Sequence, residues 1–173
     1  YDNRADDETM YEVLARLKEL GGIAGVHCEN HGIISARLKE LEKKKGGRKD
    51  VSDYPWTRPK EAEAEAVSRL LRIAKCVDTP VIVVHLSTAA GYREILRARE
   101  AGQKVYVETC PQYLLMDESR YSLPVDEARR YMVARPLRKK KKPVILWGAV
   151  KEGRIRQLRT GHCGCKTDKH RGG

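Results

Sequence analysis

Residues 80–87 of this 173-residue chain read PVIVVHLS, and this stretch decides the fold class. Its four consecutive Val and Ile residues lack the alternation of apolar and polar side chains that a half-exposed strand shows. A continuous apolar run of this length is typical of a strand in a parallel sheet that is covered on both faces. We therefore predict a buried strand over Pro80–Leu86, with His85 near its carboxyl end.

Helices and strands alternate on either side of this stretch. Apolar residues at helical spacing predict helices over 10–20, 33–45, 60–77, 88–101 and 143–151, and apolar runs predict further strands over 23–27, 104–109 and 154–158. Such alternation is typical of a parallel α/β sheet, either a barrel or an open doubly wound sheet. Since no glycine-rich phosphate fingerprint follows any strand, the sequence weighs against a dinucleotide-binding open sheet.

The composition excludes several classes of protein. Apolar residues make up 40% and charged residues 34% of the chain, which is ordinary for a water-soluble globular protein. No apolar run approaches the roughly 20 residues that a membrane-spanning helix needs. Five cysteines, an odd number without dense spacing, do not form a disulfide scaffold. We therefore expect a cytoplasmic protein with no membrane partner.

Positive charge is concentrated toward the carboxyl terminus. Residues 1–128 carry a net charge of −2, whereas residues 129–173 carry +13. A basic segment of this kind can bind nucleic acid, and such a binding module would lose affinity steeply as salt is added. No aromatic residue interrupts the run Arg138–Lys142, so a solvated surface is the simpler interpretation. We expect residues 164–173 to form a basic, disordered tail and do not expect a nucleic-acid partner.

Two histidines stand where strands are predicted to end. His27 and His85 each follow an apolar strand, so parallel strands would place both at one rim of the sheet, where barrel active sites form. Neutral imidazole suits Zn²⁺, but a catalytic zinc needs about three protein ligands. Taken alone, each histidine is more often a structural residue, and spacing does not decide between the two interpretations. Glu29 and Asn30 would either orient His27 or cap the following loop.

Seven segments, taken together and in order, resemble the dihydropyrimidinase/D-hydantoinase family of cyclic amidohydrolases. The string ETCPQY favours hydantoinases and dihydropyrimidinases over the related allantoinases and dihydroorotases. The resemblance runs from Tyr1 to about Cys163 and implies that residues 1–163 form the carboxyl-terminal half of a (β/α)8 TIM-type barrel. The segments are VHCEN (26–30), TRPKEAEAEA (57–66), VVHLS (83–87), ETCPQYL (108–114), PLR (136–138), LW (146–147) and TGHC (160–163).

The resemblance also implies a site and a reaction. The family holds two zinc ions bridged by a carboxylated lysine, and His27 and His85 match two histidines on one of them. Tyr1 matches a tyrosine that stabilises the oxyanion, and Ala134 lies where backbone groups bind the substrate imide. Gly161 occupies the position of an aspartate that ligates the other zinc and moves a proton. The implied reaction opens a cyclic amide or imide to an N-carbamoyl amino acid, in a homotetramer.

Three departures from the family pattern qualify this expectation. The His-x-His pair and the bridging lysine are absent, and Gly161 can neither bind metal nor transfer a proton. Because the chain begins with Tyr1, we expect a fragment that is inactive alone and prone to self-association through open barrel edges. The alternative is a non-catalytic relative, similar to the collapsin response mediator proteins. Gly161 favours that alternative, whereas His27 and His85 count against it.

Two cysteine-containing sites complete the candidates. Cys110 lies beside Pro111 at a predicted strand end, and no histidine–asparagine pattern accompanies it, so we expect a structural role rather than a nucleophile. The segment HCGC (162–165), together with His170, has spacing that could hold a zinc ion, and a sequence anomaly in the tail is the other interpretation.

Overall fold

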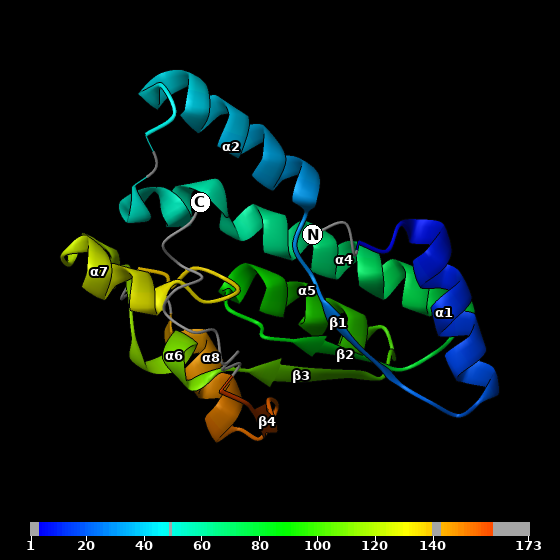
Figure 1. Cartoon of the computed structure of the whole chain (residues 1–173). Helices are drawn as coiled ribbons and strands as arrows, with labels where there is room; N and C mark the ends of the chain where they lie inside the picture. Colours follow the sequence, from blue (N-terminus) through cyan, green and yellow to red (C-terminus); the bar gives the residue numbers. More distant parts are fainter. Residues whose placement is uncertain (1–3, 49, 140–142, 161–173) are drawn as a thin grey trace.

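A computed structural model describes residues 4–48, 50–139 and 143–160. Within these residues, four parallel strands lie side by side in chain order (Figure 1). Each of the first three is followed by a segment that contains helix, as the sequence predicts for an α/β fold. The strands are β1 (Ala24–His27), β2 (Val81–Val84), β3 (Val105–Thr109) and β4 (Gln157–Leu158).

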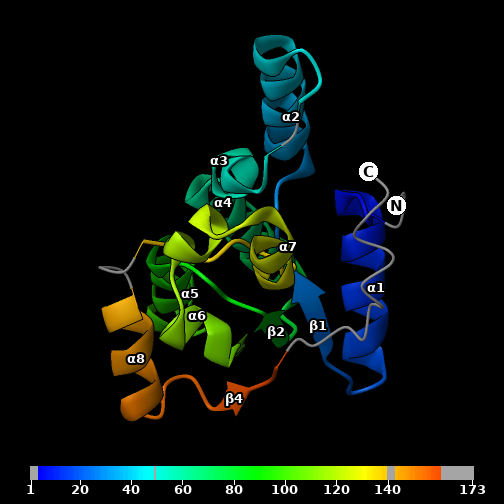
Figure 2. The same ribbon diagram turned by 60° about the vertical axis from the view of Figure 1, so that its left-hand side comes forward.

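The long helices build a layer against one face of this sheet. α4 packs against both α1 and α5, and α5 packs against α8. α1 lies beside β1 at one side of the sheet and α8 lies at the opposite side (Figure 2), while α2 extends away from the sheet (Figure 1). These helices are α1 (Asp7–Glu19), α2 (His31–Lys45), α4 (Lys60–Val77), α5 (Ala89–Glu100) and α8 (Pro143–Lys151). None of the helices in the described part of the chain is long and apolar enough to cross a bilayer.

The prediction that the strand over Pro80–Leu86 is covered on both faces is only partly correct, because one face of β2 is buried and the other is half-buried. Val81 and Val83 of β2, with Val107 of β3, are buried against the helices. On the other face Val84 is only half-buried and Tyr106 is 52% exposed. The reason is that the described helices pack on one side of the sheet, so the residues that alternate to the other side lack an apolar cover.

The segment between β3 and α8, where the sequence pattern is weakest, forms short helical turns. They are too short for a 3.6-residue period to show in the sequence. Their side chains build a second apolar cluster around Cys110, Tyr113, Tyr121 and Leu137. The elements are α6 (Pro111–Leu115), η2 (Glu118–Ser122), α7 (Val125–Ala128) and η3 (Arg129–Tyr131), and η1 (Val51–Asp53) and α3 (Tyr54–Thr57) precede α4 in the same manner.

Candidate functional site

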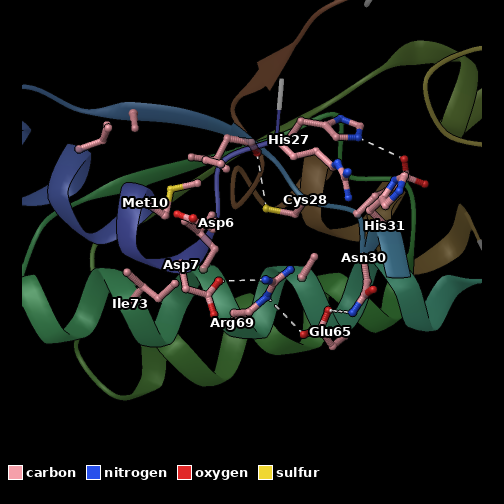
Figure 3. Close-up of a pocket in the computed structure, with 18 of the residues that line it drawn as sticks. Asp6, Asp7, Met10, His27, Cys28, Asn30, His31, Glu65, Arg69 and Ile73 are labelled. Carbon is pink, nitrogen blue, oxygen red and sulfur yellow. Dashed lines mark hydrogen bonds and ion pairs between the residues drawn. The ribbon is translucent and has the colours of Figure 1, made fainter. Parts of the chain in front are cut away.

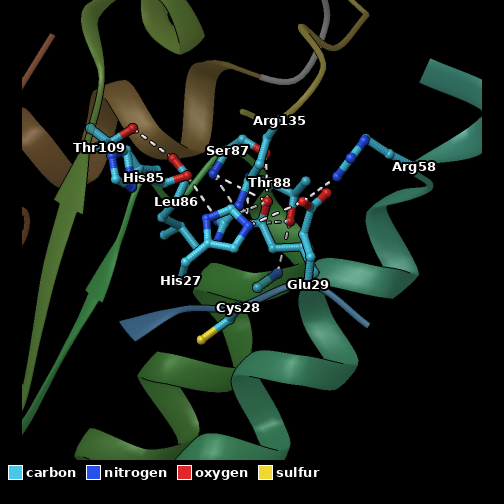
Figure 4. A network of polar contacts seen from close by, with 12 residues as sticks. His27, Cys28, Glu29, Arg58, His85, Leu86, Ser87, Thr88, Thr109 and Arg135 are labelled. Atoms are coloured by element: carbon cyan, nitrogen blue, oxygen red, sulfur yellow. Dashed lines mark hydrogen bonds and ion pairs between the residues drawn. The ribbon is translucent and has the colours of Figure 1, made fainter. Parts of the chain in front are cut away.

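His27 and His85 lie together at the carboxyl rim of the sheet (Figure 4). His27 is the last residue of β1 and His85 directly follows β2, and the parallel register aligns His27 with Val84. Their ring centroids are 6.2 Å apart. The predicted placement of both histidines at one rim is therefore confirmed.

Glu29 orients His27, whereas Asn30 has a capping role. The Oε2 atom of Glu29 lies 3.1 Å from His27 Nε2 and accepts a hydrogen bond of 2.6 Å from Arg58 Nη1. Burial opposes ionisation of this carboxyl, but the His27 hydrogen bond and the Arg58 charge outweigh it, so the pKa of Glu29 is lowered. Asn30 instead caps α2, because its side-chain oxygen accepts from the N–H of Ile33 at 3.0 Å.

His85 has an unusual backbone and a neutral ring. Its φ of 54° lies in the left-handed region, which residues with a side chain rarely adopt. Its backbone carbonyl accepts a hydrogen bond of 2.8 Å from Arg135 Nη1. Burial, followed by the charges of Arg135 and His27, lowers the pKa of His85, so the ring is neutral at pH 7. Its Nδ1 atom is buried and has no hydrogen-bond partner among the described residues.

Two imidazole rings at this separation fit part of a metal site. Zinc binds imidazole nitrogen at about 2.0–2.1 Å, so rings with centroids 6.2 Å apart can reach one ion between them. Among the described residues, no group of three or more His, Cys, Asp or Glu side chains could hold a metal. His27 and His85 would therefore hold zinc only together with ligands from outside the described residues.

The other predicted site residues are distributed differently. Tyr1 and Gly161 lie outside the described residues, as do the HCGC segment and His170. Ala134 is exposed in the loop after η3, and the preceding carbonyl, that of Val133, accepts a 2.6 Å hydrogen bond from Tyr54. Cys110 is fully buried, and burial raises its pKa to about 11, so its thiol stays protonated at neutral pH, as a structural role requires.

Sequence reasoning missed a buried ion pair next to His85. Glu63 of α4 and Arg135 are both fully buried, with Arg135 Nη1 3.2 Å from Glu63 Oε2. Glu63 stands in an alternating Glu/Ala segment that suggests a solvent-exposed helix face. The available signal was its spacing: the buried residues Val67 and Leu70 follow it by four and seven positions, on the same side of the helix.

A cavity of about 860 Å³ runs along β1 between α1 and α4 (Figure 3). Its floor carries a chain of polar contacts, in which Arg69 bonds Asp7 at 2.9 Å and Glu65 accepts from Asn30 at 2.6 Å. His27 lies at its carboxyl-rim end (Figure 3). On this side β1 pairs with no other strand of the described residues, so the cavity follows an open edge of the sheet.

Curated proteins that are similar to this chain in sequence include hydantoinases. No protein-family model matches the chain. It is 37% identical over 160 residues to the D-hydantoinase of Geobacillus stearothermophilus, covering 92% of this chain and 34% of that protein. It is 34% identical over 164 residues to the D-phenylhydantoinase of Escherichia coli. The chain thus spans about a third of the length of the curated relatives it matches.

Solved structures agree on the fold. A D-hydantoinase from a Bacillus species superimposes with a TM-score of 0.89 at 38% identity, over 96% of this chain and 36% of that one. The dihydropyrimidinase of Brevibacillus agri gives the same TM-score at 39% identity. The prediction of an α/β fold that is part of a TIM-type barrel is confirmed. Sequence and fold are therefore both similar, over nearly the whole of this chain, to about a third of the length of D-hydantoinases and dihydropyrimidinases.

Proposed function

We propose that this chain supplies part of the active site of a zinc-dependent cyclic amidohydrolase. The substrate would be a small cyclic amide or imide, either a dihydropyrimidine or a hydantoin, opened to an N-carbamoyl amino acid. Named relatives are hydantoinases and dihydropyrimidinases. The observation that carries the proposal is the pairing of His27 and His85 at the strand ends, with rings 6.2 Å apart.

In this proposal the residues of the chain hold and orient the metal. Zinc, when bound, lowers the pKa of a water molecule and polarises the substrate carbonyl. His27 binds it with a ring fixed by Glu29, which Arg58 in turn holds in place. His85 binds it as a neutral imidazole, which needs no proton release at pH 7. Ala134 is an exposed residue, and its backbone would receive the substrate imide.

The rest of the machinery is proposed to come from outside the described residues. Since a catalytic zinc needs about three protein ligands, the pair formed by His27 and His85 is insufficient. We therefore expect the purified 173-residue chain to be inactive alone, and ring opening by this chain above a metal-only blank would contradict that expectation. The complete enzyme is proposed to be cytoplasmic and homotetrameric.

The test is the zinc content of the purified chain. Metal per chain is measured by elemental analysis after dialysis, for the wild type, a His27→Ala/His85→Ala variant and a His31→Ala control. His31 is exposed at the start of α2 and its ring bonds Ser35, so its loss should leave zinc unchanged. Zinc that is present in the wild type and lost only in the double variant supports the proposal. Zinc that is present but equal in all three proteins is not held by His27 and His85, and this result favours the non-catalytic relative.

A further inference from the structure

The strongest feature that the proposed function does not use is the ion pair between Glu63 and Arg135. Both side chains are completely shielded from solvent, and they come from α4 and from the loop that follows η3. Two nitrogens of Arg135, Nε and Nη2, have no hydrogen-bond partner in the described structure. Burying two charges is costly, and an incompletely bonded pair is a poor source of stability. Its geometry points to a different role.

Both residues of the pair are hydrogen-bonded to the residues that follow β2, and Figure 4 shows Arg135 beside them. Arg135 donates to the carbonyl of His85 at 2.8 Å. Glu63 accepts from the backbone N–H groups of Ser87 and Thr88, each at 3.1 Å, and from both of their hydroxyls. Three of the four residues from 85 to 88 are thus bonded directly to this single buried pair.

The neighbouring strand β3 makes two further hydrogen bonds to the same segment. The N–H of Leu86 donates to the carbonyl of Glu108 at 2.9 Å, and the Leu86 carbonyl accepts from the hydroxyl of Thr109 at 2.7 Å. The four bonded residues begin at His85, whose φ of 54° is disfavoured for a residue with a side chain. A disfavoured backbone conformation persists only where surrounding groups hold it. Here the surrounding groups are Glu63, Arg135 and strand β3, which are bonded to residues 85–88.

We infer that Glu63 and Arg135 are positioning residues, which hold His85 in its left-handed conformation and thereby aim its ring at His27. Arg135 also directly follows Ala134, so the same side chain ties the loop proposed to receive the substrate to the backbone of a proposed zinc ligand. The inference rests on the proposed function in one respect, namely that His27 and His85 share a metal.

The test uses Co²⁺ as the probe metal and a paired substitution. Glu63→Leu/Arg135→Met removes both charges together, leaves neither partner buried alone and takes away the acceptor of the Ser87 and Thr88 N–H groups. The dissociation constant of Co²⁺ is measured by chelator competition, with the Co²⁺ absorption spectrum as a second readout. Loss of groups that orient metal ligands costs about 10–100-fold in affinity, and we expect a Co²⁺ affinity loss in that range. Leu146→Ala, in the core on α8, is the control for a general loss of stability, and its affinity should stay within about twofold of wild type.

A milder variant keeps the inference testable if the paired variant does not fold. Ser87→Ala removes one hydrogen bond to Glu63 and leaves the ion pair in place. We expect about a threefold weaker Co²⁺ affinity, the size of one hydrogen bond. Co²⁺ affinities equal to wild type in the folded variants would overturn the inference while leaving the proposed function intact.

A metal-free measurement separates the two proposals. Amide hydrogen exchange at Ser87 and Thr88 should be about tenfold faster in the paired variant than in Leu146→Ala, because both N–H groups lose their carboxylate acceptor. Equal exchange rates would overturn the positioning role. If the wild-type chain binds no Co²⁺ at all, its own residues do not suffice to hold a metal, and exchange alone then decides whether the pair holds the backbone after His85.

Discussion

Two glycine-to-alanine substitutions should change stability in opposite directions, although both glycines lie within helices. Gly91 lies in the first turn of α5, and a Cβ atom there would come 2.9 Å from Glu63 Oε1 and 3.0 Å from Leu86 Cδ1. Gly148 lies in α8, and a Cβ atom there would meet nothing within 4 Å. Neither glycine has a left-handed backbone, so only the space around the new methyl group differs.

The expected magnitudes follow from that space. Alanine is favoured over glycine inside a helix by about 0.5–1 kcal/mol, and Gly148→Ala should gain this amount. At Gly91 the methyl group must displace a buried carboxylate oxygen that accepts hydrogen bonds from Thr88. Because a hydrogen bond to a charged group contributes about 1.5–3 kcal/mol, Gly91→Ala should lose about 1–2 kcal/mol net, despite its helical gain.

Urea unfolding followed by far-UV circular dichroism measures both free energies of unfolding against wild type. We expect the two variants to differ by about 1.5–3 kcal/mol, with Gly148→Ala the more stable. A Gly91→Ala protein as stable as Gly148→Ala would refute the reasoning, since it would show that Glu63 can move without loss and is not held as the structure has it.

Three further predictions concern a helix cap, a carboxylate and two thiols. Asn30→Ala should cost about 1 kcal/mol in the free energy of unfolding, because the end of α2 loses its side-chain acceptor, whereas Asn30→Ser should restore most of it. The folded pKa of Glu29 is below its ordinary 4.5, so the unfolded chain binds its proton first as the pH falls. Stability from this group is therefore present above pH 4.5 and lost below it. When the free energy of unfolding in urea is plotted against pH, Glu29→Gln should flatten the curve below pH 4.5. An unchanged slope there would count against the His27 and Arg58 contacts. Exposed Cys76 should react with iodoacetamide at pH 8, whereas Cys110, whose pKa is raised to about 11, should be located by peptide mapping as unmodified until the chain unfolds.

Local periodicity explains why most of the long elements were predictable. The predicted limits of α4 and α8 match the structure, and those of β2 and α5 differ by one or two residues at an end. The spacing of apolar residues along a segment indicates whether it forms a helix or a strand, and this spacing can be seen without knowledge of the rest of the fold. The turns between Pro111 and Tyr131 carry no such spacing, because each is shorter than two helical turns.

The candidate site was likewise predictable from the sequence only in part. His27 and His85 could be placed at one rim from the sequence, because parallel strands necessarily present their carboxyl ends together. The roles of Glu29 and Asn30 could not be separated, since both follow His27 and either side chain could have reached it. Which one contacts the ring depended on where the end of α3 brings Arg58, and that is a property of packing.

What the sequence by itself determined is therefore the α/β class, the order of the long elements and the rim on which the paired histidines lie. Only the tertiary structure decided that Glu63 is buried against Arg135, and that both are bonded to the residues from His85 onward. The physical reason is that burial and ion pairing depend on which surfaces meet after folding. A glutamate within a Glu/Ala helix carries the same local pattern whether it faces water or a buried arginine.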